Sequence, residues 1–72
     1  MTDTETPYSA ASLLADADAA GLLVRRSRKY ASTVTSRDLS FIVQVGTMRC
    51  TKIDKNSRTT LTFDQAYDLL GL

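Results

Sequence analysis

Three short polar turns divide residues 29–63 into four runs that are rich in β-branched and aromatic residues. The turns are expected at Ser36-Arg37, Gly46-Thr47 and Lys55-Asn56. Glycine, asparagine and serine favour tight turns, and each turn sets which residues of its two flanking strands lie opposite one another. Because side chains alternate between the faces of a strand, the three turns must agree on which residues share a face. They agree throughout, so the sequence predicts a four-stranded antiparallel meander with one buried face.

The expected pairing sorts the side chains of residues 29–63 onto two faces. The pairs that the three turns place opposite each other include Val34 with Leu39, Val45 with Met48, and Cys50 with Leu61. The buried face is expected to hold Tyr30, Val34, Leu39, Phe41, Val43, Val45, Met48, Cys50, Leu61 and Phe63. The outward face is expected to hold Lys29, Ala31, Thr33, Thr35, Ser40, Ile42, Gln44, Arg49, Thr51, Ile53, Arg58, Thr60 and Thr62. One face is thus mainly apolar and the other mainly polar, which is typical of a sheet covered on one side.

A first helix is expected before the sheet. Thr6 is a good N-cap, and Pro7 suits the first helical position because proline lacks the N–H that this position leaves unpaired. Apolar residues recur at spacings of three and four up to Ala20, and Gly21 readily takes the left-handed conformation that ends a helix. Residues 1–5 are polar and are expected to form a disordered tail.

A second, shorter helix is expected to close the chain. Thr62 and Gln65 have the spacing of a capping box, and Gly71 repeats the ending expected at Gly21. The predicted fold is α+β in the order α-β-β-β-β-α, with an N-terminal and a short C-terminal helix packed on one face of the four-stranded antiparallel meander. Residues 6–72 are expected to form this single domain.

Charge is segregated along the chain. All nine lysines and arginines lie between Arg25 and Arg58, and only two of the eight acidic residues lie in that span. A basic sheet and acidic helices would give the molecule two electrically different sides, of which the basic one favours an anionic partner. The candidate partner-binding residues are the dense cluster after the first helix and two outward bases: Arg25, Arg26, Arg28, Lys29, Arg49 and Arg58.

Two interpretations of this charge pattern are open. The bases either meet an anionic partner, such as phosphate or an acidic protein surface, or keep the sheet soluble and its edge unpaired. Ile42 and Ile53, which are expected on the outward face, are likewise either scattered apolar residues or the centre of a protein contact. No aromatic residue is expected on that face, so the stacking platform of sheets that bind single strands or RNA is not expected.

The composition argues against catalysis. The chain has no histidine and one cysteine, Cys50, so neither an internal disulfide nor a zinc site is expected. Cys50 falls on the expected buried face and is interpreted as a packing residue rather than a nucleophile. Asp64 and Asp68 share a helix face, and Asp64 mainly favours the helix dipole there. We therefore expect no enzyme, no cofactor and no metal site.

Neither a membrane span nor an export signal is expected. The longest apolar run, from Ala19 to Val24, is far too short to cross a bilayer. Acids stand near the N-terminus where a secretory signal carries bases. These features indicate a cytoplasmic protein without a membrane contact.

In size and layout the chain resembles small accessory proteins of phages and mobile elements, anti-CRISPR proteins among them. The features that carry the resemblance are the 72-residue length, the helix start at Thr6-Pro7, the turns at Gly46-Thr47 and Lys55-Asn56, and the closing helix over 62–70. The resemblance implies a non-enzymatic binding protein that inhibits or modulates a larger protein or ribonucleoprotein complex by surface contact. It assigns no site residue, and the basic sheet departs from acidic mimics of nucleic acid.

Two other functions fit the same pattern. The first is a small nucleic-acid-binding module that uses the basic, Thr-rich sheet face, because arginine and glutamine hydrogen-bond base edges. The second is a structural component of a larger assembly, which needs no basic patch. The sequence leaves the identity of the partner and the oligomeric state open.

Overall fold

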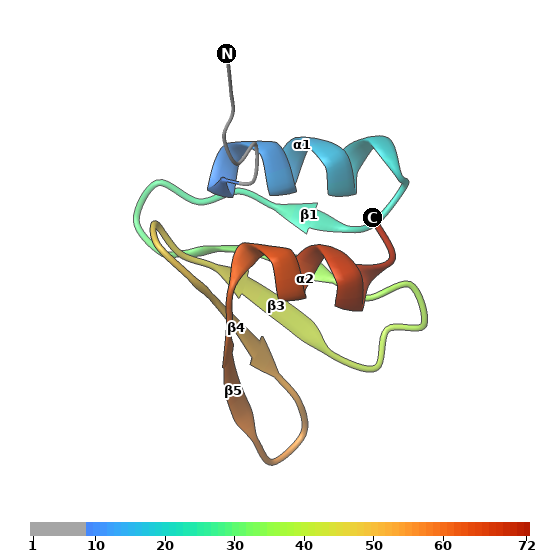
Figure 1. Cartoon of the computed structure of the whole chain (residues 1–72), viewed down its shortest axis with the longest axis vertical. Helices are drawn as coiled ribbons and strands as arrows, with labels where there is room; N and C mark the ends of the chain where they lie inside the picture. The colour runs from blue at the N-terminus through green and yellow to red at the C-terminus, as the bar shows by residue number, and fades with distance from the viewer. Residues whose placement is uncertain (1–8) are drawn as a thin grey trace.

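The computed structural model describes residues 9–72 (Figure 1). The helices are α1 (Ala10–Ala19) and α2 (Phe63–Leu70). The strands are β1 (Val24–Arg25), β2 (Ser32–Thr35), β3 (Ile42–Val45), β4 (Cys50–Ile53) and β5 (Arg58–Leu61). The strands are antiparallel and neighbour one another in chain order. The predicted α+β class and antiparallel meander are confirmed, but the sheet has five strands rather than four.

The additional strand, β1, comes from a segment that the sequence pattern assigns to a connection. Val24 pairs with Val34, and Arg25 pairs with Thr33. The prediction of four strands is wrong because a two-residue strand is too short to show an alternating pattern. The run of bases that begins at Arg25 is also more typical of a loop. Val24 packs against the core, and β1 forms one edge of the sheet.

The hairpin between β3 and β4 differs from the prediction by a shift of its turn. Val45 lies opposite Cys50 rather than Met48. The turn predicted at Gly46-Thr47 would be of type II′, which needs a positive φ at its first central residue, but Gly46 does not have one. The Gly46 N–H instead donates to the Arg49 carbonyl at 3.0 Å. The turn therefore moves one residue along the chain, and Met48 is 80% exposed rather than buried.

The loop between β2 and β3 is longer than predicted. Val34 lies opposite Val43 rather than Leu39. Leu39 has a left-handed φ of 63° and is 67% exposed, so its assignment to the buried face is wrong. The hydroxyl of Ser36 donates to the Asp38 carboxylate at 2.9 Å, which helps to hold this longer loop.

The assignment of strand residues to faces survives these two errors. Each shift moves the pairing by an even number of positions, so the alternation between faces is unchanged. The pairing of β4 with β5 is as predicted, with Cys50 opposite Leu61. Tyr30 is the remaining error on the buried face: it is 74% exposed because β2 begins only at Ser32.

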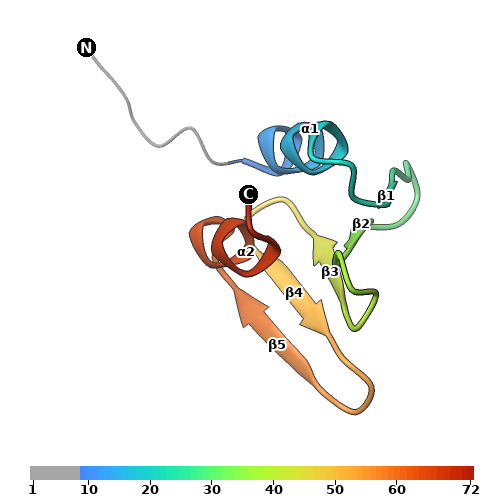
Figure 2. The same cartoon turned by 90° about the vertical axis from the view of Figure 1, so that its right-hand side faces the viewer.

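Both helices lie side by side on the same face of the sheet (Figure 2). The core between the layers consists of Leu13, Ala17, Leu22, Val34, Val43, Val45, Cys50, Ala66, Tyr67 and Leu70. Phe41, Leu61 and Phe63 are half-buried and pack against it. This packing confirms that one face of the sheet is buried under two helices, while the other is left open.

The start of α1 is set by a serine pair. Ser9 is the N-cap, and its hydroxyl accepts the Ser12 N–H at 3.2 Å while the Ser12 hydroxyl accepts the Ser9 N–H at 2.8 Å. The start expected at residues 6 and 7, and the tail expected at residues 1–5, lie outside the described residues. The helix ends as predicted, because Gly21 has a left-handed φ of 85°.

The ends of α2 are as predicted. The Thr62 hydroxyl accepts the Gln65 N–H at 3.2 Å, and the Gln65 side chain accepts the Thr62 N–H at 2.9 Å. Gly71 ends the helix with a φ of 72°. Tyr67 links α2 to α1, because its hydroxyl donates to the Asp16 carboxylate at 2.5 Å.

Candidate partner-binding surface

The face of the sheet opposite the helices is here called the open face (Figure 2). Two rows of side chains cross it from strand to strand. The polar row consists of Arg25, Thr33, Gln44, Thr51 and Thr60. The apolar row, named for its three aliphatic members, consists of Leu23, Thr35, Ile42, Ile53 and Arg58. The residues that alternate with them include the buried valines and Cys50, which face the helices, so both rows lie on the solvent side.

The apolar row contains the two isoleucines that the sequence assigns to the outward face. Ile42 is 38% exposed and lies opposite Ile53 on β4. Thr35 continues the row towards Leu23, whose carbonyl accepts the Thr35 N–H at 2.9 Å. Leu23 is 65% exposed. The sequence pattern did not place Leu23 in the row, because it lies outside the predicted sheet.

The six candidate bases do not gather into one cluster. Arg25 belongs to the polar row, Arg58 ends the apolar row, and Arg49 lies in the loop between β3 and β4. The Arg26 guanidinium instead lies 3.8 Å from the Asp18 carboxylate of α1, on the helix side of the sheet. Adjacent residues of the basic run therefore reach different sides of the molecule.

The β1–β2 loop carries the other two candidate bases, Arg28 and Lys29, which are both exposed. The Ser27 hydroxyl accepts the Tyr30 N–H at 2.9 Å and so constrains the loop. Tyr30 lines a hollow of about 630 Å³ together with Leu14 of α1. Tyr30 therefore borders the helix side of the molecule, and the open face has no aromatic residue in either row.

The five strands contain no acidic residue. Within residues 9–72 the ion pairs are Arg26 with Asp18 and Lys52 with Asp54, each at 3.8 Å. The open-face bases Arg25 and Arg58, and Arg49 in the adjoining loop, thus form no ion pair in the described part of the chain. Charges that no neighbour neutralises attract partners of opposite sign.

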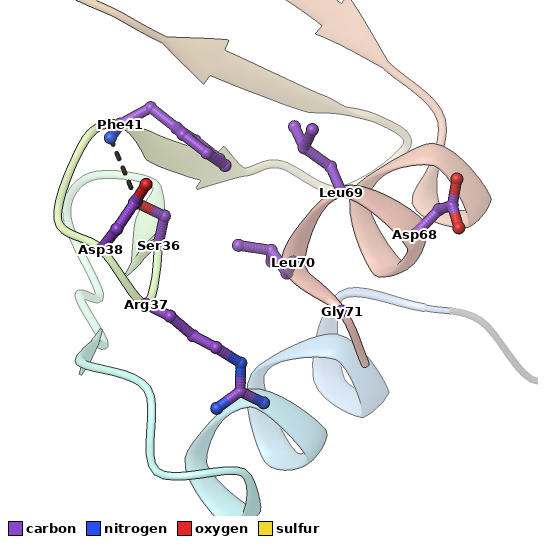
Figure 3. Close-up of a pocket in the computed structure, with 8 residues that line it drawn as sticks. All are labelled: Ser36, Arg37, Asp38, Phe41, Asp68, Leu69, Leu70 and Gly71. Carbon is purple, nitrogen blue, oxygen red and sulfur yellow. Dashed lines mark hydrogen bonds between the residues drawn. The ribbon is translucent and has the colours of Figure 1, made fainter.

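A second hollow, of about 340 Å³, lies between the β2–β3 loop and α2 (Figure 3). The side chains of Phe41, Leu69 and Leu70 line its apolar part, and Arg37 extends past it towards α1. Leu70 belongs to the core, whereas Leu69 is 42% exposed. This hollow is on the helix side and is separate from the open face.

The polar groups beside that hollow hold the β2–β3 loop together. Hydrogen bonds from the hydroxyls of Ser40, at 2.7 Å, and Ser36, at 2.9 Å, lower the pKa of Asp38. The Ser36 hydroxyl also accepts the Phe41 N–H at 3.2 Å, drawn as a dashed line in Figure 3. Both Asp38 and Ser36 therefore use their side chains in hydrogen bonds that stabilise the loop.

Cys50 lies in the core, with no exposed surface. Burial raises the pKa of its thiol, which keeps the sulfur protonated and unreactive at neutral pH. In the part of the chain that the structure describes, no three His, Cys, Asp or Glu side chains are grouped as metal ligands.

Within residues 9–72 neither helix has the length and apolar character that crossing a bilayer requires. Comparisons with models of protein families, with curated proteins and with solved structures gave no match to this chain.

Proposed function

We propose that the chain is a non-enzymatic binding protein that inhibits or modulates a larger protein or ribonucleoprotein complex by surface contact, in the manner of small anti-CRISPR-type accessory proteins. The observation that carries the proposal is the open face, where Arg25 and Arg58 project from a sheet without acidic residues. The other face is occupied by the core, which leaves this one for a partner. The proposal places this activity in the cytoplasm.

The charges support binding through their effect on association. Bases on an uncovered sheet steer an anionic surface into contact and raise the association rate constant. Arg49 extends this positive region beyond the end of β3. Because salt screens such long-range attraction, the association rate is expected to fall as ionic strength rises.

A small nucleic-acid-binding module is the second candidate, and the polar row favours it. Arg25 and Gln44 are of the residue types that hydrogen-bond base edges, and they stand in one row with three threonines. Arg28 and Lys29 in the neighbouring loop would suit phosphate contacts.

The proposal is tested by capture of partners from lysates of candidate host cells, with and without nuclease. The test variant is Arg25→Glu/Arg58→Glu, and the matched control is Asp18→Lys/Asp68→Lys on the exposed surface of the helices. Asp16 is not used as a control, because it accepts the hydrogen bond of the buried Tyr67. The captured partner is then used for measurement of association and dissociation rates.

Capture that survives nuclease and is weakened at least fivefold by the arginine reversal, mainly in the association rate, supports the protein-binding proposal. Capture that disappears with nuclease favours the nucleic-acid module. Normal capture by the arginine variant, with loss in the aspartate variant, would place the partner on the helices and refute both.

A further inference from the structure

We infer that the open face is built for an acidic protein surface with an apolar centre. The aliphatic side chains of the apolar row form the middle of the contact, and Arg25 and Arg58 lie at its margins. The inference rests on the proposed function and adds the chemistry of the partner.

The apolar row is continuous enough to serve as a contact centre. Ile42 and Ile53 are directly opposite each other on neighbouring strands, and Thr35 joins Ile42 to Leu23. Strands lie about 4.8 Å apart, so side chains in one row touch across the sheet. Leu23 and Ile42 are 65% and 38% exposed, so a partner that covers them removes apolar area from water.

The arginines define the charge of the surface that would cover this row. Arg25 lies on β1 and Arg58 on β5, which are the two edge strands, so positive charge flanks the face on both sides. A second copy stacked on this face would bring positive margins together with no acid in the strands to compensate. A partner with carboxylates at its margins instead forms paired hydrogen bonds with each guanidinium.

The same face is poorly matched to nucleic acid. Neither row contains an aromatic side chain on which a base would stack. In a complex with nucleic acid, Leu23 and Ile42 would lie against sugar and phosphate groups, which are polar and make few favourable apolar contacts. An apolar centre with arginine at its rim is instead the usual composition of protein–protein interfaces.

The test is fluorescence anisotropy of the full chain with three labelled probes. The first is a peptide with leucines on one side and glutamates on the other, the second a length-matched peptide of glutamate and serine, and the third a short DNA duplex. The test variant is Ile42→Thr/Ile53→Thr, which keeps β-branched residues in the strands. The control is Leu69→Gln on α2, because Leu69 is 42% exposed, close to the value of Ile42, but lies on the helix side.

Wild type is expected to bind the leucine–glutamate peptide about tenfold more tightly than the serine–glutamate peptide. The threonine variant should lose that difference while its affinity for the serine–glutamate peptide is unchanged, and Leu69→Gln should behave as wild type. Circular dichroism confirms that each variant is folded. If the double variant does not fold, Leu23→Ser provides the same test outside the strands, because Leu23 precedes β1.

Three results would overturn the inference. Equal affinity for the two peptides would show that the apolar row takes no part in the contact. The open face would still bind through its bases, so the proposed function would stand. Tighter binding of the duplex than of either peptide would assign the face to nucleic acid. Failure to bind any of the three anionic probes would contradict both the inference and the proposed function.

Discussion

Replacing Tyr67 with phenylalanine tests how the two helices are joined above the sheet. The Tyr67 side chain is 7% exposed, its hydroxyl donates to the Asp16 carboxylate at 2.5 Å, and the Ser12 hydroxyl lies 3.1 Å away. A hydrogen bond to a charged group contributes about 1.5–3 kcal/mol, but Asp16 is exposed and regains water when the hydroxyl is removed. We therefore expect Tyr67→Phe to lower the free energy of unfolding by about 1–2 kcal/mol.

The assay is urea denaturation of a double-mutant cycle between Tyr67→Phe and Asp16→Ala, with thermal unfolding as a second measurement. The pair should show a coupling free energy of about 1 kcal/mol, and Tyr67→Phe alone should lower Tm by about 5–10 °C. Tyr30→Phe is the matched control, because Tyr30 is 74% exposed and its loss of a hydroxyl should change stability by less than about 0.5 kcal/mol. A coupling energy within about 0.3 kcal/mol of zero would refute the proposed link between α1 and α2.

Three further predictions concern the core and the β2–β3 loop. Cys50 should resist a thiol reagent in the native protein and react on unfolding, as followed by mass spectrometry, because it is buried and burial raises its pKa; rapid native labelling would contradict this. Leu39→Gly should raise the free energy of unfolding by about 0.5 kcal/mol, since relief of the left-handed φ exceeds the added chain entropy of glycine; denaturation that shows a loss would contradict it. Hydrogen bonds from Ser40 and Ser36 lower the pKa of Asp38, so the stability that this carboxylate contributes is complete above the ordinary pKa of 3.8 and is lost as pH falls through the lowered value. Asp38→Asn should therefore make the free energy of unfolding depend less steeply on pH in the acid range, and an unchanged dependence would contradict this role.

Local chemistry made the ends of the helices predictable to different degrees. The Thr62–Gln65 capping box and the left-handed Gly71 depend on contacts within a turn of the chain, so they were predicted correctly. The cap that the structure shows for α1, Ser9, was not singled out from the sequence, because serine and threonine are both common N-caps and local preference does not choose between them.

The faces of the sheet were predictable because alternation tolerates an even shift in pairing. Val43 and Cys50 are both buried, as predicted. Neither lies opposite the residue that the turns expected at 36–37 and 46–47 would place there, but the difference in pairing is an even number of residues and leaves the face unchanged. Residues at the turns have no such protection. Leu39 and Met48 are exposed rather than buried as predicted, because backbone conformation and hydrogen bonds within the loops decide where each strand ends. Neither of these has a periodic signal in the sequence.

The short strand β1 accounts for most of what the sequence could not show about the candidate surface. If residues 23–25 formed a connection, the open face would end at β2, and one of its edges would carry no arginine. Pairing of Val24 with Val34 instead brings Leu23 into the apolar row and Arg25 into the polar row. Both edge strands then present an arginine on either side of an aliphatic row, and the proposal of an acidic protein partner rests on this arrangement. Charge counting along the chain treats Arg25 and Arg26 alike, and only strand pairing separates Arg25, on the open face, from Arg26, which lies beside α1.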